Sequence, residues 1–245
     1  MKKKTLIKSV ICFSLVGVTA FGLNQMIKKQ PDLTGKYLQN MVVSAVEPDN
    51  ETLANQDYTV LVNAEHPLQK EYVPRNLVTV SYTEEKLTEV AAKQMSAMIR
   101  ELEKEGYTIL PLSGYRSYDR QQTLFDRKVF ELMQTNKSLT KEEAEKKAAE
   151  FVEIPGTSEH QTGLAMDVAL RDDEADPPME ESPEGKWLID NAYRYGFIVR
   201  YPKTEDAKKD VSYEPWHLRY VGTELAEQLQ KSGERLEEYK EKILS

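Results

Sequence analysis

The chain has 245 residues, of which 40% are hydrophobic and 30% are charged, and its formal net charge is -8. A chain of this length and composition is long enough for one globular domain with appendages. The acidic balance argues against nucleic acid or an anionic membrane surface as the main partner, because such surfaces favour clustered Lys and Arg.

The first 29 residues carry the pattern of an export signal. Lysines at positions 2, 3, 4 and 8 precede an uncharged, mostly apolar run over residues 9–23. A basic segment of this kind stays on the cytoplasmic side while the apolar run enters the bilayer, so we expect the rest of the chain to be delivered across the membrane. Residues 18–20 (Val-Thr-Ala) offer a small-residue cleavage site, whereas the near-spanning length of the run favours an uncleaved anchor.

The sole cysteine, Cys12, lies inside this apolar run and not at its C-terminal edge, where a lipid-attachment cysteine would lie. We therefore interpret it as a small apolar residue. The exported part then contains no cysteine. It has to be held by its own core without disulfides, and a metal site in it has to use His, Asp and Glu.

Residues 30–56 are polar and aperiodic, which is typical of a linker or stalk. We expect one folded domain over residues 57–222 and a C-terminal helical tail over residues 223–245. Alternating side chains over residues 58–62 predict a short strand at the start of the domain.

A long helix and a strand are predicted next. Apolar residues at helical spacing favour a helix that begins after Thr83 as N-cap and stops at Gly106. Residues 107–113 read as a strand that runs into a turn at Gly114. The apolar face of the helix is expected to pack on the core of the domain.

Two further helices follow this turn. Ser117 is the predicted N-cap of a helix with an apolar stripe. Thr140 and Glu143 form a capping-box pattern for a charged helix that extends to about residue 152. The charged run in this last helix is most simply a solvated face.

The second half of the domain is rich in strands. Residues 164–170 alternate large apolar residues with small or polar ones, so Asp167 projects from the face opposite the apolar side chains, into a cleft. A helix over residues 182–196 separates this segment from two more predicted strands, over residues 197–202 and 213–222. Helices group before the strands more than they alternate with them. This order indicates an α+β fold with a small, mainly antiparallel sheet flanked by helices.

Five polar side chains supply the parts that a metal hydrolase needs. Such an enzyme requires two or three N/O ligands, an open position for water, a carboxylate that takes a proton, and a donor for the developing oxyanion. The candidate ligands are His160, Asp167 and His217, the candidate base is Glu214, and the candidate electrophilic helper is Arg116.

The spacing of these residues is physically sensible. His160 lies in a loop, and Gly163 lets the backbone reverse tightly so that Asp167 returns along a strand toward the same side. The base and the second histidine are three residues apart, and such residues face opposite ways in an ideal strand. We therefore expect Pro215 to mark a bend, a bulge or the entry of the strand.

Each of these residues alone also fits an ordinary structural role. A histidine such as His217 is more often packed and hydrogen-bonded than bound to a metal. Asp167 would serve as a turn cap, Glu214 as a surface charge and Arg116 as an ion-pair partner of Asp119. Only their joint occurrence indicates a site.

Three blocks, "SGYRS", "GTSEHQTGLAMDV" and "EPWHLRY", resemble the signature blocks of the VanY-type zinc D-alanyl-D-alanine carboxypeptidases. The resemblance covers residues 57–222, and the blocks occur in the family's order, which makes it far more specific than any single block. The family patterns Ser-x-His-x-x-Gly-x-Ala-x-Asp and Glu-x-x-His are met by Ser158, His160, Gly163, Ala165 and Asp167 and by Glu214 and His217.

The resemblance implies one zinc ion bound by His160, Asp167 and His217, in a cleft on the sheet of a catalytic domain. It implies that Glu214 is the general base. Arg116 matches the family arginine that faces the scissile carbonyl or the substrate carboxylate. No residue at the metal or base positions departs from the family pattern.

A carboxypeptidase also has to recognise a free C-terminal carboxylate, and Ser158 and Gln122 are the further candidate donors to it. His66 lies where no ligand is expected, so we interpret it as a structural or surface residue. The implied partners are peptidoglycan stem peptides, and neither nucleic acid nor membrane is expected beyond the N-terminal segment.

The resemblance covers removal of D-alanine from pentapeptide stems (D,D) and from tetrapeptide stems (L,D). We expect the D,D activity, because that is the family's usual name. Two further alternatives remain at this point: an endopeptidase that cuts cross-bridges, and a cell-wall binding module without hydrolysis. Retention of Glu214 argues against the binding module, because a structural zinc needs no base and is usually closed by a fourth protein ligand.

Overall fold

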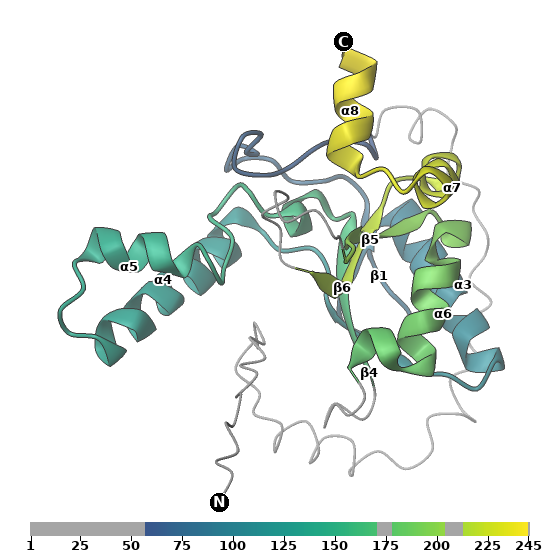
Figure 1. Cartoon of the computed structure of the whole chain (residues 1–245), viewed down its shortest axis with the longest axis horizontal. Coiled ribbons are helices and arrows are strands. Elements are labelled where there is room, and N and C mark those ends of the chain that lie inside the picture. The colour runs from purple at the N-terminus through teal and green to yellow at the C-terminus, as the bar shows by residue number, and fades with distance from the viewer. Residues whose placement is uncertain (1–56, 171–177, 204–212, 245) are drawn as a thin grey trace, which may run out of the picture. The chain divides into compact units, whose positions relative to one another are not determined.

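The computed structural model describes residues 57–170, 178–203 and 213–244. This part of the chain combines helices with antiparallel sheets (Figure 1), which confirms the predicted α+β class. No helix within it is long and apolar enough to cross a membrane. The predicted signal segment and linker, residues 1–56, lie outside the described residues.

The central sheet has four strands in the order β3-β4-β6-β5, and every neighbouring pair is antiparallel. All four strands were expected from the sequence, β4 from its alternation of large apolar with small or polar residues. Their bounds are β3 (Ile109–Ser113), β4 (Ala165–Leu170), β5 (Phe197–Tyr201) and β6 (Glu214–Tyr220).

One face of this sheet packs against α3 (Glu89–Lys104) and α6 (Pro183–Asn191) (Figure 1). Met166 on β4 and Leu218 on β6 point into this core and are 0% exposed. Burial of each such side chain contributes roughly 1.5–3 kcal/mol. Because side chains alternate along a strand, Asp167 projects from the opposite face. The sheet therefore separates the apolar core from a polar face.

The region around α6 follows the prediction. A 3-10 turn, η2 (Met179–Glu181), precedes α6, whose N-cap Ser182 accepts a hydrogen bond from the backbone of Gly185 at 2.9 Å. A second 3-10 turn, η3 (Ala192–Tyr195), continues α6 as far as Gly196. Gly196 has a left-handed backbone conformation with φ of 78°, which ends the helix as expected.

The start of the long helix α3 was predicted too early. Residues Lys86–Thr88 form the strand β2 and pair antiparallel with β1 (Leu77–Thr79). The hydroxyl of Thr83 accepts a hydrogen bond from the backbone of Glu85 at 3.0 Å, so it stabilises the turn before β2 and caps no helix. The helix ends as predicted, next to Gly106.

The predicted strand over residues 58–62 is wrong. The carbonyl oxygens of Tyr58 and Val60 accept hydrogen bonds from the guanidinium of Arg219, at 3.0 and 2.8 Å. An arginine side chain thus takes the place of a neighbouring strand, while the side chains of Tyr58 and Val60 still pack against the main core. The alternation of apolar residues over residues 58–62 therefore reflects burial against the core and not pairing with another strand.

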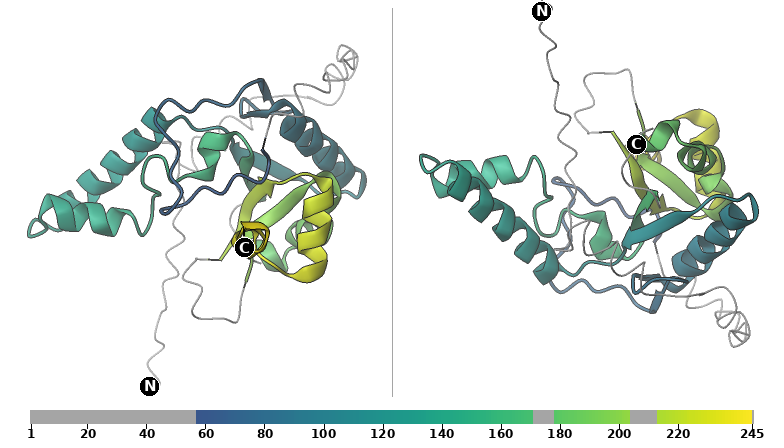
Figure 2. Two further views of the ribbon diagram at one scale, coloured as in Figure 1. Left: turned by 90° about the horizontal axis from the view of Figure 1, so that it is seen from above. Right: turned by 90° about the horizontal axis from the view of Figure 1, so that it is seen from below.

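A helical hairpin of α4 (Tyr118–Thr135) and α5 (Lys141–Ala148) projects from the rest of the domain (Figures 1 and 2). Ser117 caps α4, and the capping box of Thr140 and Glu143 begins α5, as predicted. The helix α5 is shorter than predicted. The hairpin is held by its own apolar cluster, whose buried members are Phe125, Val129, Ala144 and Ala148.

The C-terminal tail consists of two helices, α7 (Thr223–Ser232) and α8 (Leu236–Leu244). Gly233, with φ of 70°, ends α7 and turns the chain. Buried side chains that include Leu229 and Leu236 form a second apolar cluster with this tail. The tail is therefore part of the packed domain.

Candidate metal centre

The polar face of the sheet brings two of the predicted ligands together. Asp167 on β4 and His217 on β6 are direct cross-strand partners. Such partners project on the same side of an antiparallel pair, so their side chains meet. Nδ1 of His217 lies 3.0 Å from Oδ1 of Asp167.

The third predicted ligand, His160, comes from the 3-10 turn η1 (Glu159–Thr162), which precedes β4. Gly163 ends this turn with φ of 67°, a conformation that favours glycine. A Cβ at this position would also lie only 3.0 Å from the side chain of Leu77. The tight reversal leaves Nε2 of His160 3.2 Å from Oδ2 of Asp167, as the spacing predicted.

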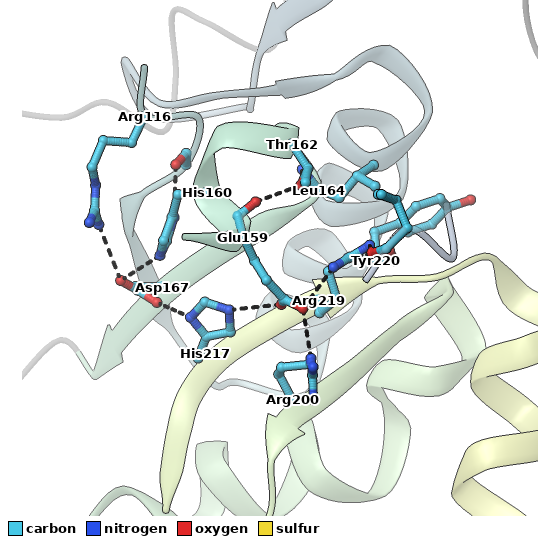
Figure 3. A network of polar contacts seen from close by, with 12 residues as sticks. Arg116, Glu159, His160, Thr162, Leu164, Asp167, Arg200, His217, Arg219 and Tyr220 are labelled. Atoms are coloured by element: carbon cyan, nitrogen blue, oxygen red, sulfur yellow. Dashed lines mark hydrogen bonds and ion pairs between the residues drawn. The ribbon is translucent and has the colours of Figure 1, made fainter. Parts of the chain in front are cut away.

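The three donor groups form a compact cluster (Figure 3). One ligand atom from each of His160, Asp167 and His217 lies within 4.8 Å of the others. In a tetrahedral zinc site with metal–donor distances of about 2.0–2.2 Å, neighbouring donor atoms are about 3.3–3.6 Å apart. The aspartate oxygens lie 3.2 and 3.0 Å from the two imidazole nitrogens, slightly closer than this.

The hydrogen-bond partners fix which nitrogen of each histidine is free to bind a metal. Nδ1 of His160 lies 2.9 Å from the carbonyl oxygen of Gly114, which only accepts, so Nδ1 donates and Nε2 is free. Nε2 of His217 lies 3.4 Å from Oε2 of Glu159, which only accepts, so Nε2 donates, and Nδ1 lies 3.0 Å from Oδ1 of Asp167. The nitrogens left for a metal, which would replace any proton held against Asp167, are therefore Nε2 of His160 and Nδ1 of His217, and both face Asp167 (Figure 3). Such partners orient metal-binding imidazoles and raise their basicity.

Glu159 is a fully buried carboxylate beside the cluster, with 0% exposure. Its Oε1 lies 2.8 Å from Nε of Arg200 and 2.8 Å from Nη1 of Arg219. Burial alone would raise the pKa of Glu159, but the two guanidinium groups and His217 hold it well below its usual range. Glu159 is therefore a permanent anion that accepts the hydrogen bond of His217.

The charges around the cluster of His160, Asp167 and His217 favour a bound cation. Burial lowers the pKa of His217, but its hydrogen bonds to Asp167 and Glu159 outweigh burial and raise this pKa to about 10. Burial likewise raises the pKa of Asp167, and the two histidines hold it below its usual range. The carboxylates around His217 therefore favour a positive charge at this cluster, as binding of a cation requires.

Arg116 lies at the edge of the cluster, as predicted, with Nη2 4.0 Å from Oδ2 of Asp167 (Figure 3). Its guanidinium donates to Oγ of Ser113 at 2.9 Å and to Oε1 of Gln121 at 2.7 Å. Its backbone N–H donates to the carbonyl of His160 at 3.1 Å. The arginine is therefore held in place beside the metal ligands.

The sequence reasoning chose Gln122, but its neighbour Gln121 contacts the site. The side chain of Gln122 donates to Asp126 one turn along α4, at 2.8 Å. Gln121 is 1% exposed and also donates to the carbonyl of Glu153 at 2.6 Å. Gln121 lies on the same buried face of α4 as the apolar residues, so helical periodicity would have predicted that Gln121, and not Gln122, is buried. A contact of Gln122 with substrate stays a prediction.

Ser158, the other predicted substrate residue, immediately precedes η1 and is 1% exposed. Within the part of the chain that the structure describes, its Oγ has no hydrogen-bond partner. A buried hydroxyl without a partner costs free energy, and a contact of Ser158 with substrate stays a prediction. His66, by contrast, is exposed and hydrogen-bonds Asn63 away from the cluster, in agreement with the surface role expected for it.

Glu214, the predicted base, begins β6 opposite Tyr201. The register between β5 and β6 shifts between this pair and the pair Val199–Leu218, so β6 is irregular around Pro215, as predicted. Burial raises the pKa of Glu214 to about 7, while the nearby His217 opposes this shift. A carboxyl group with this pKa is suited to take and return protons near neutral pH.

Sequence reasoning missed Glu159, Arg200 and Arg219. The two arginines interrupt otherwise apolar strands, "FIVRY" and "WHLRY", and a charge in such a strand needs a buried partner. The two arginines could therefore have been predicted to need a buried acid, but the sequence does not show that this acid is Glu159. Glu159 comes from a distant segment, and only the folded sheet brings the three together.

The residues present fit a catalytic zinc ion. Two imidazoles and one carboxylate are typical catalytic zinc ligands, and three protein ligands leave a coordination position open for water or substrate. The hydrogen-bonded second nitrogens complete the usual surroundings of such a site. The described residues contain no thiolate or other group within this cluster that would close the fourth position.

Comparison with known proteins matches residues 84–223 to one family, VanY: D-alanyl-D-alanine carboxypeptidase. The protein of Bacillus subtilis (strain 168) named "Putative carboxypeptidase YodJ" is 43% identical over 204 residues, covering 79% of this chain and 71% of its own.

Two examples represent the solved structures that are similar to this chain. The LdcB LD-carboxypeptidase is 41% identical, covers 74% of this chain and 84% of its own, and has a TM-score of 0.63. The E175A mutant of the vancomycin resistance D,D-pentapeptidase VanY, in complex with Zn(II), is 34% identical, covers 75% and 99%, and has a TM-score of 0.63.

We expect the full-length protein to bind one zinc ion, and alanine at His160, Asp167 or His217 to reduce the bound zinc strongly, because each change removes a direct ligand. Elemental analysis after gel filtration measures this ratio. His66→Ala is the matched control and should keep the wild-type zinc content. A ligand variant with wild-type zinc content would remove that residue from the ligand set.

Proposed function

Because the chain belongs to the VanY family of D-alanyl-D-alanine carboxypeptidases, we propose that it removes the C-terminal D-alanine from peptidoglycan stem peptides in a zinc-dependent reaction. The proposal assigns the zinc to His160, Asp167 and His217. It assigns proton transfer to Glu214 and the stabilisation of developing negative charge to Arg116.

One observation carries this proposal. Three candidate ligand side chains converge on the polar face of the sheet, and the strand that carries His217 begins with Glu214, whose pKa burial raises to about 7. A purely structural metal site has no use for such a carboxyl group. A hydrolase needs it, because its water must lose a proton and its leaving amine must gain one.

The reaction follows from the arrangement of the side chains. A zinc ion held by the three ligands supplies the Lewis acidity that makes water a nucleophile and polarises the scissile carbonyl. Glu214 takes the proton of the attacking water and passes it to the departing amine of D-alanine. Arg116, held by Ser113 and Gln121, donates to the oxygen on which negative charge develops, or to the substrate carboxylate.

Recognition of a free C-terminus requires donors to a carboxylate. Arg116 provides a planar guanidinium that matches a carboxylate. The buried hydroxyl of Ser158, which has no partner within the described residues, provides a further donor. These groups support the choice of an exopeptidase over an endopeptidase, whose substrate has no carboxylate at the cleaved bond.

A second candidate activity is L,D-carboxypeptidase action on tetrapeptide stems. The observation in its favour is the similarity to the LdcB LD-carboxypeptidase, at 41% identity and a TM-score of 0.63. Both activities release D-alanine and need the same metal, base and carboxylate donors. They differ in the residue that precedes the scissile bond, so substrate length and stereochemistry separate them.

We also propose that the catalytic domain works outside the cytoplasmic membrane, where peptidoglycan is found. The support is the basic and apolar pattern over residues 1–29. Attachment to the membrane would be through this segment alone, as a signal anchor, or would be lost if the segment is cleaved as a signal peptide.

We expect the full-length zinc protein to release D-alanine from a stem pentapeptide that ends in D-Ala-D-Ala. Glu214→Gln should keep the zinc and bind the peptide, while turnover falls by about 10²–10⁴-fold, because the amide has no basic carboxylate. Mass spectrometry of the products and elemental analysis of both proteins measure these effects.

The same assay decides between the alternatives. Release of D-alanine only from a tetrapeptide stem would establish the L,D activity. Cleavage within a cross-bridge would establish an endopeptidase, and binding without any product would establish a binding module. Wild-type turnover by Glu214→Gln would show that another group is the base.

The value of kcat/KM should rise with pH as Glu214 loses its proton and fall as pH drops, because only the carboxylate accepts a proton. This acidic limb of the kcat/KM profile should have its midpoint below pH 7, because a bound cation lowers the pKa of Glu214 that burial raises to about 7. Among the nearby charges, Glu153 raises this pKa. Glu153→Gln should therefore move the limb to lower pH, as a pH profile of kcat/KM would record.

Glu150→Gln is the matched control for this change, because Glu150 is an exposed acid close by in sequence. It should leave the limb in place. If Glu153→Gln left the limb unmoved, or moved it to higher pH, the limb would belong to a group other than Glu214.

Export is tested with a reporter enzyme that is active only outside the cytoplasmic membrane, fused after Ser245. The full-length fusion should be active, and a matched fusion that lacks residues 2–23 should be inactive, because the apolar run directs export. Equal reporter activity in both fusions would reject the role of this segment.

A further inference from the structure

The metal centre is connected to the C-terminal helix α8 by a series of ionic contacts whose inner members, Arg200 and Glu159, are buried. Glu237 on α8 accepts hydrogen bonds from both terminal nitrogens of Arg200, at 3.1 Å for Nη1 and 2.5 Å for Nη2. This is the paired geometry in which a carboxylate holds an arginine most firmly. The helix α8 lies beyond residue 223, where the match to the family ends.

The third donor of the same arginine reaches the metal centre. Nε of Arg200 donates to Oε1 of Glu159 at 2.8 Å, and the other oxygen of Glu159 lies 3.4 Å from Nε2 of His217 (Figure 3). The side chains of Arg200 and Glu159 are 1% and 0% exposed. Solvent therefore cannot replace these contacts, and the position of Arg200 bears directly on that of Glu159.

The charges of this group balance. Glu159 and Glu237 carry two negative charges, and Arg200 and Arg219 carry two positive charges. Loss of the charge on Glu237 would leave one excess positive charge, buried beside a site that has to hold a cation. In a buried environment such a charge is only weakly screened.

The second arginine is held differently. Arg219 donates to the backbone carbonyls of Tyr58 and Val60, which carry no net charge. Lys240 on α8 in turn donates to Thr59, at 2.9 Å, so α8 also fixes this segment. Both arginines that hold Glu159 thus depend on elements outside residues 84–223, and α8 contributes to both.

We propose that Glu237 is a positioning residue of the metal centre: it holds Arg200, which holds Glu159, which fixes the ring of His217. The C-terminal helix is then part of the catalytic apparatus and not only a cap on the fold. This proposal rests on the proposed function only in requiring that the cluster binds zinc.

A purely structural role for Glu237 would be to attach α8 to the domain. Leu236, which is 0% exposed and lies in the apolar cluster of the tail, already anchors this helix. A structural role would affect the stability of the tail but would leave the metal site unchanged. The two roles therefore differ in metal affinity and in the spectrum of a bound metal.

The experiment compares zinc affinity in the full-length wild-type protein, Glu237→Gln and the control Glu241→Gln, by competition with a chromophoric chelator. Glu241 is an exposed acid one turn further along α8, so the control removes the same charge from the same helix. We expect Glu237→Gln to bind zinc about 10-fold more weakly, at the lower end of the range for outer partners of metal ligands. The control should match wild type.

Cobalt substitution gives a second readout. The visible absorption bands of bound Co²⁺ report the geometry of its ligands, so Glu237→Gln should shift them and Glu241→Gln should not. Circular dichroism confirms that each variant is folded. If Glu237→Gln fails to fold, Glu237→Asp takes its place, because it keeps the charge but is too short for both hydrogen bonds to Arg200.

A double-mutant cycle tests whether Glu237 acts through Glu159. Once Glu159→Gln has removed the carboxylate that holds His217, adding Glu237→Gln should weaken zinc binding less than it does alone. Additive losses would show an independent effect and overturn the proposed series of contacts.

A loss of zinc affinity smaller than about threefold in the substituted protein, with unshifted cobalt bands, would overturn the proposal. A wild-type protein that binds no zinc would reject the proposed function together with it. A wild-type protein that binds zinc but releases no D-alanine would reject the proposed function alone, because the affinity comparison would still decide the role of Glu237.

Discussion

The structure of the site depends on one buried carboxylate, that of Glu159. An anion without solvent is costly unless charges and donors surround it, and here Arg200, Arg219 and His217 do so from two adjacent strands. These contacts constrain the positions of β5, β6 and η1 relative to one another. The carboxylate therefore links the packing of the sheet to the orientation of a candidate metal ligand, His217.

Catalysis benefits from the same constraint. Glu159 and the carbonyl of Gly114 hold the two histidines by different ring nitrogens, so that Nδ1 of His217 and Nε2 of His160 both face Asp167. A site whose ligands are oriented before the metal binds loses little free energy to rearrangement. The proposed base, Glu214, takes no part in these hydrogen bonds, and burial raises its pKa to about 7, a value suited to proton transfer.

Local patterns in the sequence predicted most of this arrangement. The reversal at Gly163, the alternation that exposes Asp167 and the irregularity at Pro215 each depend on a few neighbouring residues. The partners of Glu159 and the contact from Glu237 join segments far apart in the chain, and no local pattern encodes them. The false strand over residues 58–62 has the same origin, because its carbonyls bind an arginine from β6.

The role of Glu159 is tested most directly by the ¹⁵N NMR spectrum of the histidine rings in the zinc-loaded protein. We expect His217 to bind the metal through Nδ1 and to carry its proton on Nε2, opposite Glu159. We expect the reverse for His160, with the proton on Nδ1 toward Gly114. A His217 ring that binds zinc through Nε2, or a ring shift unaffected by zinc, would contradict the central role given to Glu159.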